Sequence, residues 1–439
     1  MFDRVVMIKT STSPYVLREW ESQTFGEMEL TPDDRELLNR FSDNCFKVDE
    51  LRNGVRFSAT SWIGVVKFTN FEVQITPKLA GEHLGLLQLI EYVLGIDSFK
   101  RSIGARTLCS DGGNLFDLIA LLFAEACERL IRRGILYDYV EREAELTTVK
   151  GKILVDRQMR LRFGRVDRIE CRYDEYESDI IENQIIAYAL SEIEKRVKHE
   201  ATKRKFRHLL LVFEGVCKKE QLDIAGTRES IIYNRLNGHY KEAHELVWLL
   251  FDALGINDLY KSGKTRCFAF ILDMNTIFEH FIYKWIKQLI RNLNYSLRYQ
   301  VKDKSIIWNA TARRSYSKVI PDLLIRSRDH IEQQLAIDAK YKNYDERKLD
   351  PQDVYQLFLY AYAYGKGIES HSPPALLVYP STSTVSTIIE LNIKNTFGLT
   401  GASIYIQGLY IPEALNEAST NFQGPLSNTF LESIVKLIS

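Results

Sequence analysis

The chain has 439 residues, of which 45% are hydrophobic. This is enough apolar material for two or three cores, because single domains seldom grow beyond about 300 residues. Lysine plus arginine and aspartate plus glutamate both total 58, which excludes a whole-molecule positive field that would attract nucleic acid. Six scattered cysteines without a Cys-x-x-Cys pair exclude a disulfide framework and a structural zinc site.

Scattered thiols are typical of a reducing compartment. No apolar run approaches the length of about 20 residues that a membrane span needs, and charged residues interrupt the first ten positions. We therefore expect a soluble cytoplasmic protein without a membrane partner.

The first hundred residues alternate between apolar and polar positions, as strands do. Turn signals at Asn53-Gly54 and Thr69-Asn70 separate the segments, so the pattern predicts a β-meander. Helical spacing follows over residues 84–94. We expect a β-rich N-terminal module over residues 1–100, with strands at residues 45–48, 55–57, 62–68 and 71–77.

Residues 101–263 are predicted to form a mainly helical middle region. Apolar residues recur at helical spacing over residues 115–135, and Gly134 marks the end of that helix. A second helix is expected over residues 179–197. The densest basic run follows it, over residues 195–207, and two interpretations stay open: a solvated helix face, which we favour, or a stripe that follows phosphates.

Residues 264–439 are predicted to form an α/β domain. A strand and an amphipathic helix open it, several strands follow, and a helix and a further strand come after them. The expected helices are residues 274–293 and 351–364, and the expected strands are residues 268–271, 296–301, 305–308, 319–325, 335–340 and 375–380.

Two of these strands carry charged residues inside apolar segments. Asp322 follows Pro321 in one strand, and the other strand ends in Asp338-Ala339-Lys340. Residues two apart on a strand face the same side, so Asp338 and Lys340 would point into one site. An unpaired charge at such positions would be costly, so we favour catalysis over the alternative of ordinary surface ion pairs.

This combination suits the hydrolysis of a phosphodiester. Hard divalent cations take oxygen ligands, and the candidates are the carboxylates of Asp322 and Asp338 and the carbonyl of Ala339. We expect Mg²⁺, with Mn²⁺ as a substitute. The sequence thus predicts a metal-dependent phosphodiesterase.

Further residues would complete the site. Lys340 would orient the attacking water or help to deprotonate it. Lys342 and Lys318 are candidates for contact with DNA phosphates, Lys342 if its strand continues. Gln356 and Tyr360 are four apart on the following helix, so they share one face and would bracket the site.

These residues resemble the PD-(D/E)xK nuclease superfamily, in its branch with a Gln-x-x-x-Tyr element after the lysine. The wider chain is similar to the McrC family, the nuclease subunits of McrBC modification-dependent restriction systems. The supporting segments are Trp62-Ile63-Gly64-Val65-Val66, Ile75-Thr76-Pro77-Lys78, Val149-Lys150-Gly151-Lys152-Ile153, Asp174-Glu175-Tyr176, Glu182-Asn183 and Met274-Asn275 to Phe278-Glu279.

The resemblance implies a restriction-endonuclease-like C-terminal domain and an endodeoxyribonuclease that cuts double-stranded, modified DNA with Mg²⁺. It places catalysis on Asp322, Asp338 and Lys340, with Glu279 in support. It also implies a partner, McrB, an AAA+ GTPase hexamer that recognises modified cytosine and translocates DNA. The N-terminal module of McrC would dock on that ring and stimulate its GTP hydrolysis in antiviral defence.

This chain has no Gly-x-x-x-x-Gly-Lys-Ser/Thr loop, so we expect no GTP hydrolysis by the chain itself. Arg52, Asn53 and Arg56 are candidates for partner contact, because a hairpin tip with arginines can reach into a ring. An ordinary solvated hairpin explains them equally well.

Two other functions stay open at this point. One is a stand-alone or DNA-repair nuclease, because the Gln-x-x-x-Tyr element also occurs in that wider branch. The other is a regulatory adaptor that activates a ring NTPase without cutting DNA.

Overall fold

The computed structural model describes most of the chain. Among the described residues, no helix has the length and apolar character needed to cross a bilayer. The described residues are 5–6, 14–26, 28–41, 44–79, 83–110, 113–161, 163–165, 167–218, 222, 224–254, 267–330, 332–345, 347–365, 373–384 and 388–438.

The chain divides into two compact units. The first contains Met1–Gly64, Asn70–Asp97 and Ile271–Ser439, and the second contains Val65–Thr69 and Ser98–Phe270. The second unit is thus inserted into the sequence of the first. Both units contain helices and strands, so the protein is a multidomain α+β protein, as expected. The domain limits 1–100, 101–263 and 264–439 stay a prediction.

The strands β1 to β7, together with β11, form two sheets, not the single meander that we expected. One sheet has the order β1-β3-β5-β4, and the other has the order β11-β6-β7-β2. The chain therefore changes sheets between β5 and β6, at the short connection Thr60-Ser61. The strands are β1 Val5–Val6, β2 Tyr15–Arg18, β3 Ser22–Gly26, β4 Phe46–Leu51, β5 Gly54–Ala59, β6 Trp62–Lys67, β7 Glu72–Thr76 and β11 Phe268–Asp273.

Two helices accompany these sheets. Helix α1 (Pro32–Leu38) begins with a capping box, in which Thr31 and Asp34 bond each other's backbone N–H groups. Helix α2 (His83–Leu94) follows β7, close to the predicted residues 84–94. The apolar spacing thus predicted α2 closely, whereas α1 was not predicted.

The C-terminal part of the first unit is built on a six-stranded sheet with the order β12-β15-β16-β17-β19-β18. The pairings β15–β16 and β18–β19 are antiparallel, whereas β17 runs parallel to both β16 and β19. The strands are β12 Tyr295–Tyr299, β15 Leu323–Ser327, β16 Gln334–Ala339, β17 Pro374–Pro380, β18 Ile388–Lys394 and β19 Thr400–Leu409. A separate hairpin pairs β13 Asp303–Asn309 with β14 Arg314–Val319.

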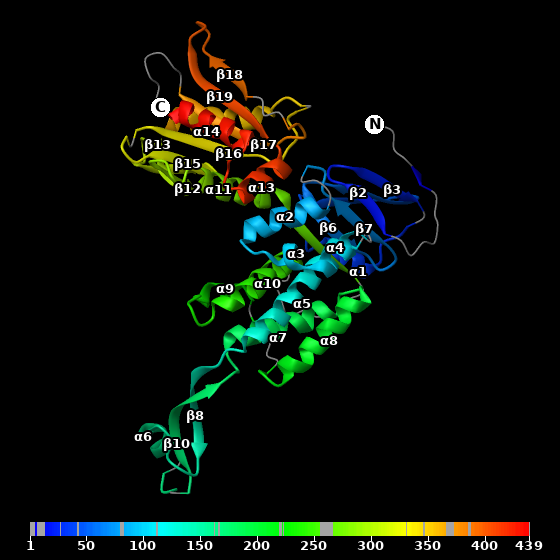
Figure 1. The fold of residues 1–439 in the computed structure, drawn as a ribbon, viewed down its shortest axis with the longest axis vertical. Coiled ribbons are helices and arrows are strands. Elements are labelled where there is room, and N and C mark those ends of the chain that lie inside the picture. Colours follow the sequence, from blue (N-terminus) through cyan, green and yellow to red (C-terminus); the bar gives the residue numbers. More distant parts are fainter. Residues whose placement is uncertain are drawn as a thin grey trace. The chain divides into compact units, whose positions relative to one another are not determined.

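Helix α12 (Pro351–Tyr364) covers one face of this sheet, where Ala336 of β16 packs with Leu357 and Tyr360 of the helix. Side chains alternate along a strand, so Asp338 faces the same side as Ala336. Helices α11 (Met274–Leu289) and α14 (Pro425–Ile438) also contact β16, and α13 (Ile411–Ser419) packs on α14. Figure 1 labels the strands of this sheet and the helices α11, α13 and α14.

The second unit is mainly helical. Asn114 caps the N-terminus of α5 through its side chain, and Gly134 ends that helix with a φ of 110°. The helices are α3 Ser98–Arg101, α4 Ile103–Ser110, α5 Leu115–Arg133, α6 Val155–Leu161, α7 Ile181–Glu194, α8 Glu200–Glu214, α9 Ile224–Ser230 and α10 Lys241–Leu254, with a 3-10 turn at Gly238–Tyr240.

A three-stranded sheet in this unit was missed by our sequence reading. Strands β8 (Asp138–Leu146) and β10 (Ile169–Glu177) pair antiparallel over nine residues, and β9 (Lys152–Ile153) pairs with β10. Gly151 sits beside β9 with a φ of 66°, where a Cβ would lie 2.3 Å from the carbonyl oxygen of Arg172. We call the sheet and α6 the arm, which Figure 1 shows extending from α5 and α7.

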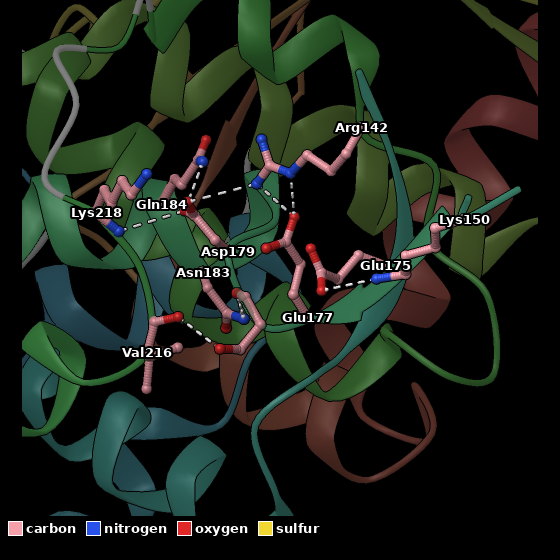
Figure 2. Close-up of polar contacts among 10 residues, drawn as sticks. Arg142, Lys150, Glu175, Glu177, Asp179, Asn183, Gln184, Val216 and Lys218 are labelled. Carbon is pink, nitrogen blue, oxygen red and sulfur yellow. Dashed lines mark hydrogen bonds and ion pairs between the residues drawn. The ribbon is translucent and has the colours of Figure 1, made fainter. Parts of the chain in front are cut away.

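Polar contacts hold the base of the arm, as Figure 2 shows. Arg142 of β8 donates to Glu177 of β10 at 2.8 Å, and its guanidinium also lies 4.0 Å from Asp179. Asp179 in turn accepts from the side chain of Gln184 at 2.9 Å and from the backbone of Lys218 at 3.3 Å. The arm is therefore anchored on both of its long strands.

Four basic residues of the run over residues 195–207 form ion pairs with glutamates. Lys205 lies 2.9 Å from Glu128, and Arg207 lies 3.2 Å from Glu194. Lys195 and Arg196 both pair with Glu192. These ion pairs agree with the solvated-face interpretation.

Buried His244 of α10 predicts a pH dependence of stability. Its Nε2 lies 3.1 Å from the carbonyl oxygen of Glu182, and its Nδ1 lies 3.0 Å from the hydroxyl of Tyr233. Burial lowers the pKa of His244 to about 4, whereas an unfolded histidine has a pKa of about 6.5. The unfolded state therefore binds the proton first, and stability falls by up to about 3 kcal/mol as the pH drops from about 6.5 to 4.

Urea unfolding at several pH values would measure this loss in wild type and in His244→Gln. The glutamine does not titrate, so its unfolding free energy should fall less steeply below pH about 6.5. Equal slopes in the two proteins would contradict the assignment.

Candidate active site

Asp322 lies just before β15, and its carboxylate reaches the end of β16. We expected Pro321 and Asp322 inside a strand, but β15 begins only at Leu323. Pro321 lacks the N–H that a central strand would use, which explains the interruption after β14. The Asp322 Oδ2 accepts a hydrogen bond of 2.8 Å from the backbone N–H of Ala339. This bond brings the two predicted strand segments together.

Asp338 and Lys340, which we expected to point into one site, form an ion pair. Asp338 is fully buried in β16, and Lys340 follows the last residue of that strand. The Lys340 Nζ lies 3.1 Å from the Asp338 Oδ2, with 23% of the Lys340 side chain exposed. Neither Asp338 oxygen has an aligned hydrogen-bond partner among the described residues, so the contact with Lys340 is a charge contact.

The charges of the site strongly affect one another. Burial raises the pKa of Asp322 to about 8, and the nearby Asp338 and Glu279 contribute to the rise. Burial likewise raises the pKa of Asp338, although Lys340 opposes the rise. Burial alone would lower the pKa of Lys340, but Asp338 and Asp322 outweigh it and raise that pKa. Lys340 is thus held as an ammonium by two carboxyl groups.

Glu279 of α11 is connected to Asp322 through Gln300. Its Oε1 accepts a hydrogen bond of 2.8 Å from the side chain of Gln300. The backbone N–H of Gln300 in turn donates to the carbonyl of Asp322 at 2.9 Å. Gln300, which we did not predict, therefore links Glu279 to Asp322. Gln300 has a positive φ of 44°. Glutamine seldom adopts a positive φ, so the sequence did not indicate this conformation.

Gln356 and Tyr360 lie on one face of α12 and act on the segment before Asp322. The Tyr360 hydroxyl donates to the carbonyl of Ile320 at 2.8 Å, and Gln356 donates to the Tyr360 oxygen at 2.7 Å. This chain of bonds fixes the backbone two residues before Asp322. The two residues therefore position the carboxylate of Asp322 through the backbone.

Lys342 is ion-paired on the next turn of the chain, where the strand no longer continues. Its Nζ lies 2.7 Å from Asp350 and 2.9 Å from Asp353. Asp353 is buried and also accepts from the Tyr344 hydroxyl. Sequence reasoning missed Asp353, because an aspartate in the first turn of a helix is expected there for electrostatic reasons alone. Lys318 is exposed on β14.

The three candidates for partner contact lie at different places in the hairpin. Arg52 and Asn53 are exposed at the turn between β4 and β5. Arg56 instead lies within β5, half-buried, where its Nε approaches the Thr24 hydroxyl at 3.4 Å. Only the first two residues thus stand at the tip of the hairpin.

The donor set at the end of β16 is all oxygen. Among the described residues, no group of three or more His, Cys, Asp or Glu side chains is arranged to hold a metal ion. A site for a hard cation here would therefore use the carboxylates of Asp322 and Asp338 and the carbonyl of Ala339. The buried Asp338 carboxylate, whose ion-pair partner is Lys340, fits this use, because a bound cation would further offset the cost of burying its charge.

Comparison with known proteins decides the family. Residues 57–380 match the model of the McrBC 5-methylcytosine restriction system component family, which is more than half of the chain. This chain belongs to that family. The McrBC match confirms the resemblance to the McrC family, and its range includes Asp322, Asp338 and Lys340. No curated protein matches the chain.

A solved structure from Thermococcus gammatolerans resembles this McrBC family member in fold. It is the refined half-complex from the tetradecameric assembly of McrB AAA+ hexamers with bound McrC. It has 21% sequence identity and a TM-score of 0.58, and the match covers 95% of this chain and 100% of that chain. The cryo-EM structure of the McrBC complex matches with 19% identity and a TM-score of 0.46, covering 63% of this chain and 88% of that chain.

The site predicts that Asp322→Asn stabilises the metal-free protein. The asparagine oxygen can still accept from the N–H of Ala339, while the substitution removes a carboxyl group whose raised pKa means that its ionised form is destabilised in the folded protein. We expect the free energy of unfolding at pH 7 to rise by about 1 kcal/mol. Urea unfolding with a chelator present measures the change.

Asp345→Asn is the matched control in the same unit. Burial alone would raise the pKa of Asp345, but hydrogen bonds from Thr382, Tyr379 and Ser381 outweigh it and lower that pKa. This carboxylate is therefore stabilised as an anion, and its substitution should cost about 1 kcal/mol. If both variants lose stability equally, the repulsion at Asp322 is not significant.

Proposed function

We propose that this chain is the Mg²⁺-dependent DNA endonuclease subunit of an McrBC-like modification-dependent restriction system. Its C-terminal domain is a PD-(D/E)xK nuclease in which Asp322, Asp338 and Lys340 are catalytic. It works with an McrB-like AAA+ GTPase hexamer and stimulates the GTP hydrolysis of that partner. The observation that carries the proposal is the buried pair of Asp338 and Lys340 beside the Asp322 carboxylate, in a chain of this family.

Each residue of the proposed site has a role that follows from its chemistry. Asp322, Asp338 and the Ala339 carbonyl would hold the cation, which supplies charge neutralisation at the phosphate and a more acidic water when bound. Mn²⁺ offers similar octahedral oxygen coordination and would substitute. Lys340, held as an ammonium, places positive charge where the phosphate gains negative charge, and it can orient the attacking water.

The surrounding residues keep this constellation in place. Glu279 and Gln300 support Asp322 from one side, through the backbone bond to its carbonyl. Gln356 and Tyr360 support it from the other side, through the carbonyl of Ile320. Both supports act on the backbone, so neither of them occupies the Asp322 carboxylate, whose Oδ2 accepts from the Ala339 N–H. This preorganisation is what a fast phosphoryl reaction requires.

Delivery of DNA would fall to the partner. The chain carries equal numbers of acidic and basic residues, so its own field attracts DNA weakly. Lys342 would exchange Asp350 and Asp353 for a DNA phosphate, and exposed Lys318 would contact another. A motor that recognises modified double-stranded DNA supplies the affinity that this surface lacks.

The partner assignment rests on family and on the chemistry of the chain. The Thermococcus gammatolerans relative is described as McrC bound to McrB AAA+ hexamers. This chain has no phosphate-binding loop of its own, so the GTP site would belong to the partner. Cytoplasmic DNA that enters the cell would be the target of such a system.

Two exposed surfaces are available for docking on the ring. One is the hairpin tip with Arg52 and Asn53. The other is the tip of the arm, residues 147–168, which holds seven basic and two acidic residues. Large apolar side chains are exposed there, which marks an interaction surface more strongly than two polar residues do. They are Val149, Val155, Met159, Leu161 and Phe163, each more than half exposed.

Alanine substitution of Asp338 or Lys340 is expected to reduce DNA cleavage by more than about 100-fold. The assay contains the full chain, its cognate GTPase, GTP, Mg²⁺ and DNA with modified cytosine. Asp350→Ala is the control, because this exposed carboxylate pairs with Lys342 at the edge of the site. Wild-type cleavage by either site variant would overturn the nuclease assignment, as would cutting that survives metal chelation.

GTPase stimulation tests the docking surfaces separately from cutting. We expect Leu161→Ser combined with Phe163→Ser to lower stimulation of the partner by about tenfold, because apolar contact area is lost. Arg52→Ala should reduce it less, by about twofold. Full stimulation by the double variant, with loss in Arg52→Ala, would assign the contact to the N-terminal hairpin.

A further inference from the structure

The buried Glu19 lies next to the nuclease site although it belongs to the N-terminal sheets. Its side chain is 1% exposed, and it follows β2 in the chain. The Glu19 Oε2 accepts a hydrogen bond of 2.7 Å from the backbone N–H of Lys78. It also accepts from the Tyr341 hydroxyl at 3.2 Å, across 322 positions of sequence. All three residues belong to the same compact unit.

Tyr341 occupies a special place in the chain, immediately after Lys340. The backbone N–H of Lys342 bonds the carbonyl of Lys340 at 2.9 Å, which makes Tyr341 the central residue of a three-residue turn. The backbone N–H of Lys340 is fixed separately, by the carbonyl of Val378 at 2.9 Å. The direction of the Lys340 side chain therefore depends on this turn.

The ring of Tyr341 is enclosed by residues from two directions. Trp20, next to Glu19, has its ring centroid 5.8 Å from that of Tyr341. Phe278 of α11, next to Glu279, lies at the same 5.8 Å on another side. Tyr341 is 1% exposed in consequence. The ring thus connects the N-terminal sheets, Lys340 and the helix that carries Glu279.

We propose that Glu19 is a positioning residue of the nuclease site, which acts through Tyr341 to hold Lys340 toward Asp338. The inference rests on the proposed nuclease function and adds a requirement to it. The N-terminal sheets become a structural part of the active site, in addition to any contact that they make with a partner. Glu19 itself touches neither the substrate nor the reacting atoms.

The chemical state of Glu19 supports this role and selects the test. Burial raises its pKa to about 8, although bonds from Lys78 and Tyr341 oppose the rise. Its other oxygen, Oε1, has no hydrogen-bond partner among the described residues. The Glu19 carboxyl is therefore neutral near pH 7. Glutamine is a close match to it in shape, charge and acceptor capacity. Alanine removes the acceptor from both of its donors.

The test compares Glu19→Ala, Glu19→Gln and Tyr341→Phe in the full cleavage reaction with the cognate GTPase. We expect kcat to fall about tenfold or more in Glu19→Ala and Tyr341→Phe, with KM for DNA unchanged, because a misplaced catalytic group slows the chemical step. Glu19→Gln should stay within about twofold of wild type.

Hydrogen exchange of the backbone gives a readout that does not depend on cutting. We expect the amides of Lys340 and Lys342 to exchange about tenfold faster in Glu19→Ala than in wild type, while amides of α14 keep their protection. Glu417→Ala is the matched control, because this buried glutamate in the same unit bonds the backbone N–H groups of Leu426 and Ser427. It should lower stability without changing exchange at Lys340.

The outcomes separate the two proposals. If Glu19→Ala matches Glu417→Ala in exchange at residues 339–342 and keeps kcat within about twofold of wild type, Glu19 is a packing residue only. If wild type itself does not cut, the nuclease proposal fails, whereas the exchange comparison still decides whether Glu19 orders the turn at Tyr341. If glutamine fails to restore kcat, the role assigned to the neutral acceptor is wrong.

Discussion

Two neighbouring carboxyl groups, Asp338 fully buried and Asp322 half-buried, constrain the C-terminal domain. Loss of water around them raises the pKa of both groups, and Lys340 is the cation that keeps this arrangement tolerable. A protein selected only for stability would replace such a cluster with apolar residues. The cluster therefore indicates a use, and a hard divalent cation is the simplest additional charge that would relieve it.

Strand pairing or hydrogen bonds of the backbone hold each charged group of the cluster in place. Asp338 is fixed by its place in a central strand, with a parallel neighbour on one side and an antiparallel one on the other. Asp322 lies outside regular structure, so two sets of hydrogen bonds hold its backbone. Lys340 has left the strand as well and depends on the turn at Tyr341. Positions outside the strands thus receive the most hydrogen-bond support.

Local patterns in the sequence predicted a large part of this arrangement. Helix α12 and the end of β16 follow directly from apolar spacing and from the charged residues placed within it. The exchange of sheets between β5 and β6 could not be predicted, because a short connection looks the same within a meander and between two sheets. The arm was missed because its strands are charged and half-exposed, although Asp138–Leu146 alternates as a strand does.

The long-range contacts were beyond sequence reading for a different reason. Asp353 and Gln300 have ordinary local surroundings, and their importance appears only when distant segments meet at Lys342 and Asp322. Glu19 is the extreme case, because its partner Tyr341 lies 322 positions away. Periodicity reports which face of an element is buried, but it does not report which element covers that face.

The insertion of the second unit within the first has a consequence for synthesis on the ribosome. The segment up to Asp97 leaves the ribosome first, but the rest of its unit begins only at Ile271. Helices α3 to α10 of the inserted unit are all translated before Ile271, so their contacts with one another, such as those of α5 with α8 and α10, can form in the meantime. Buried N-terminal residues such as Glu19 must wait for that whole stretch to be translated, so they are exposed to chaperones and proteases longest.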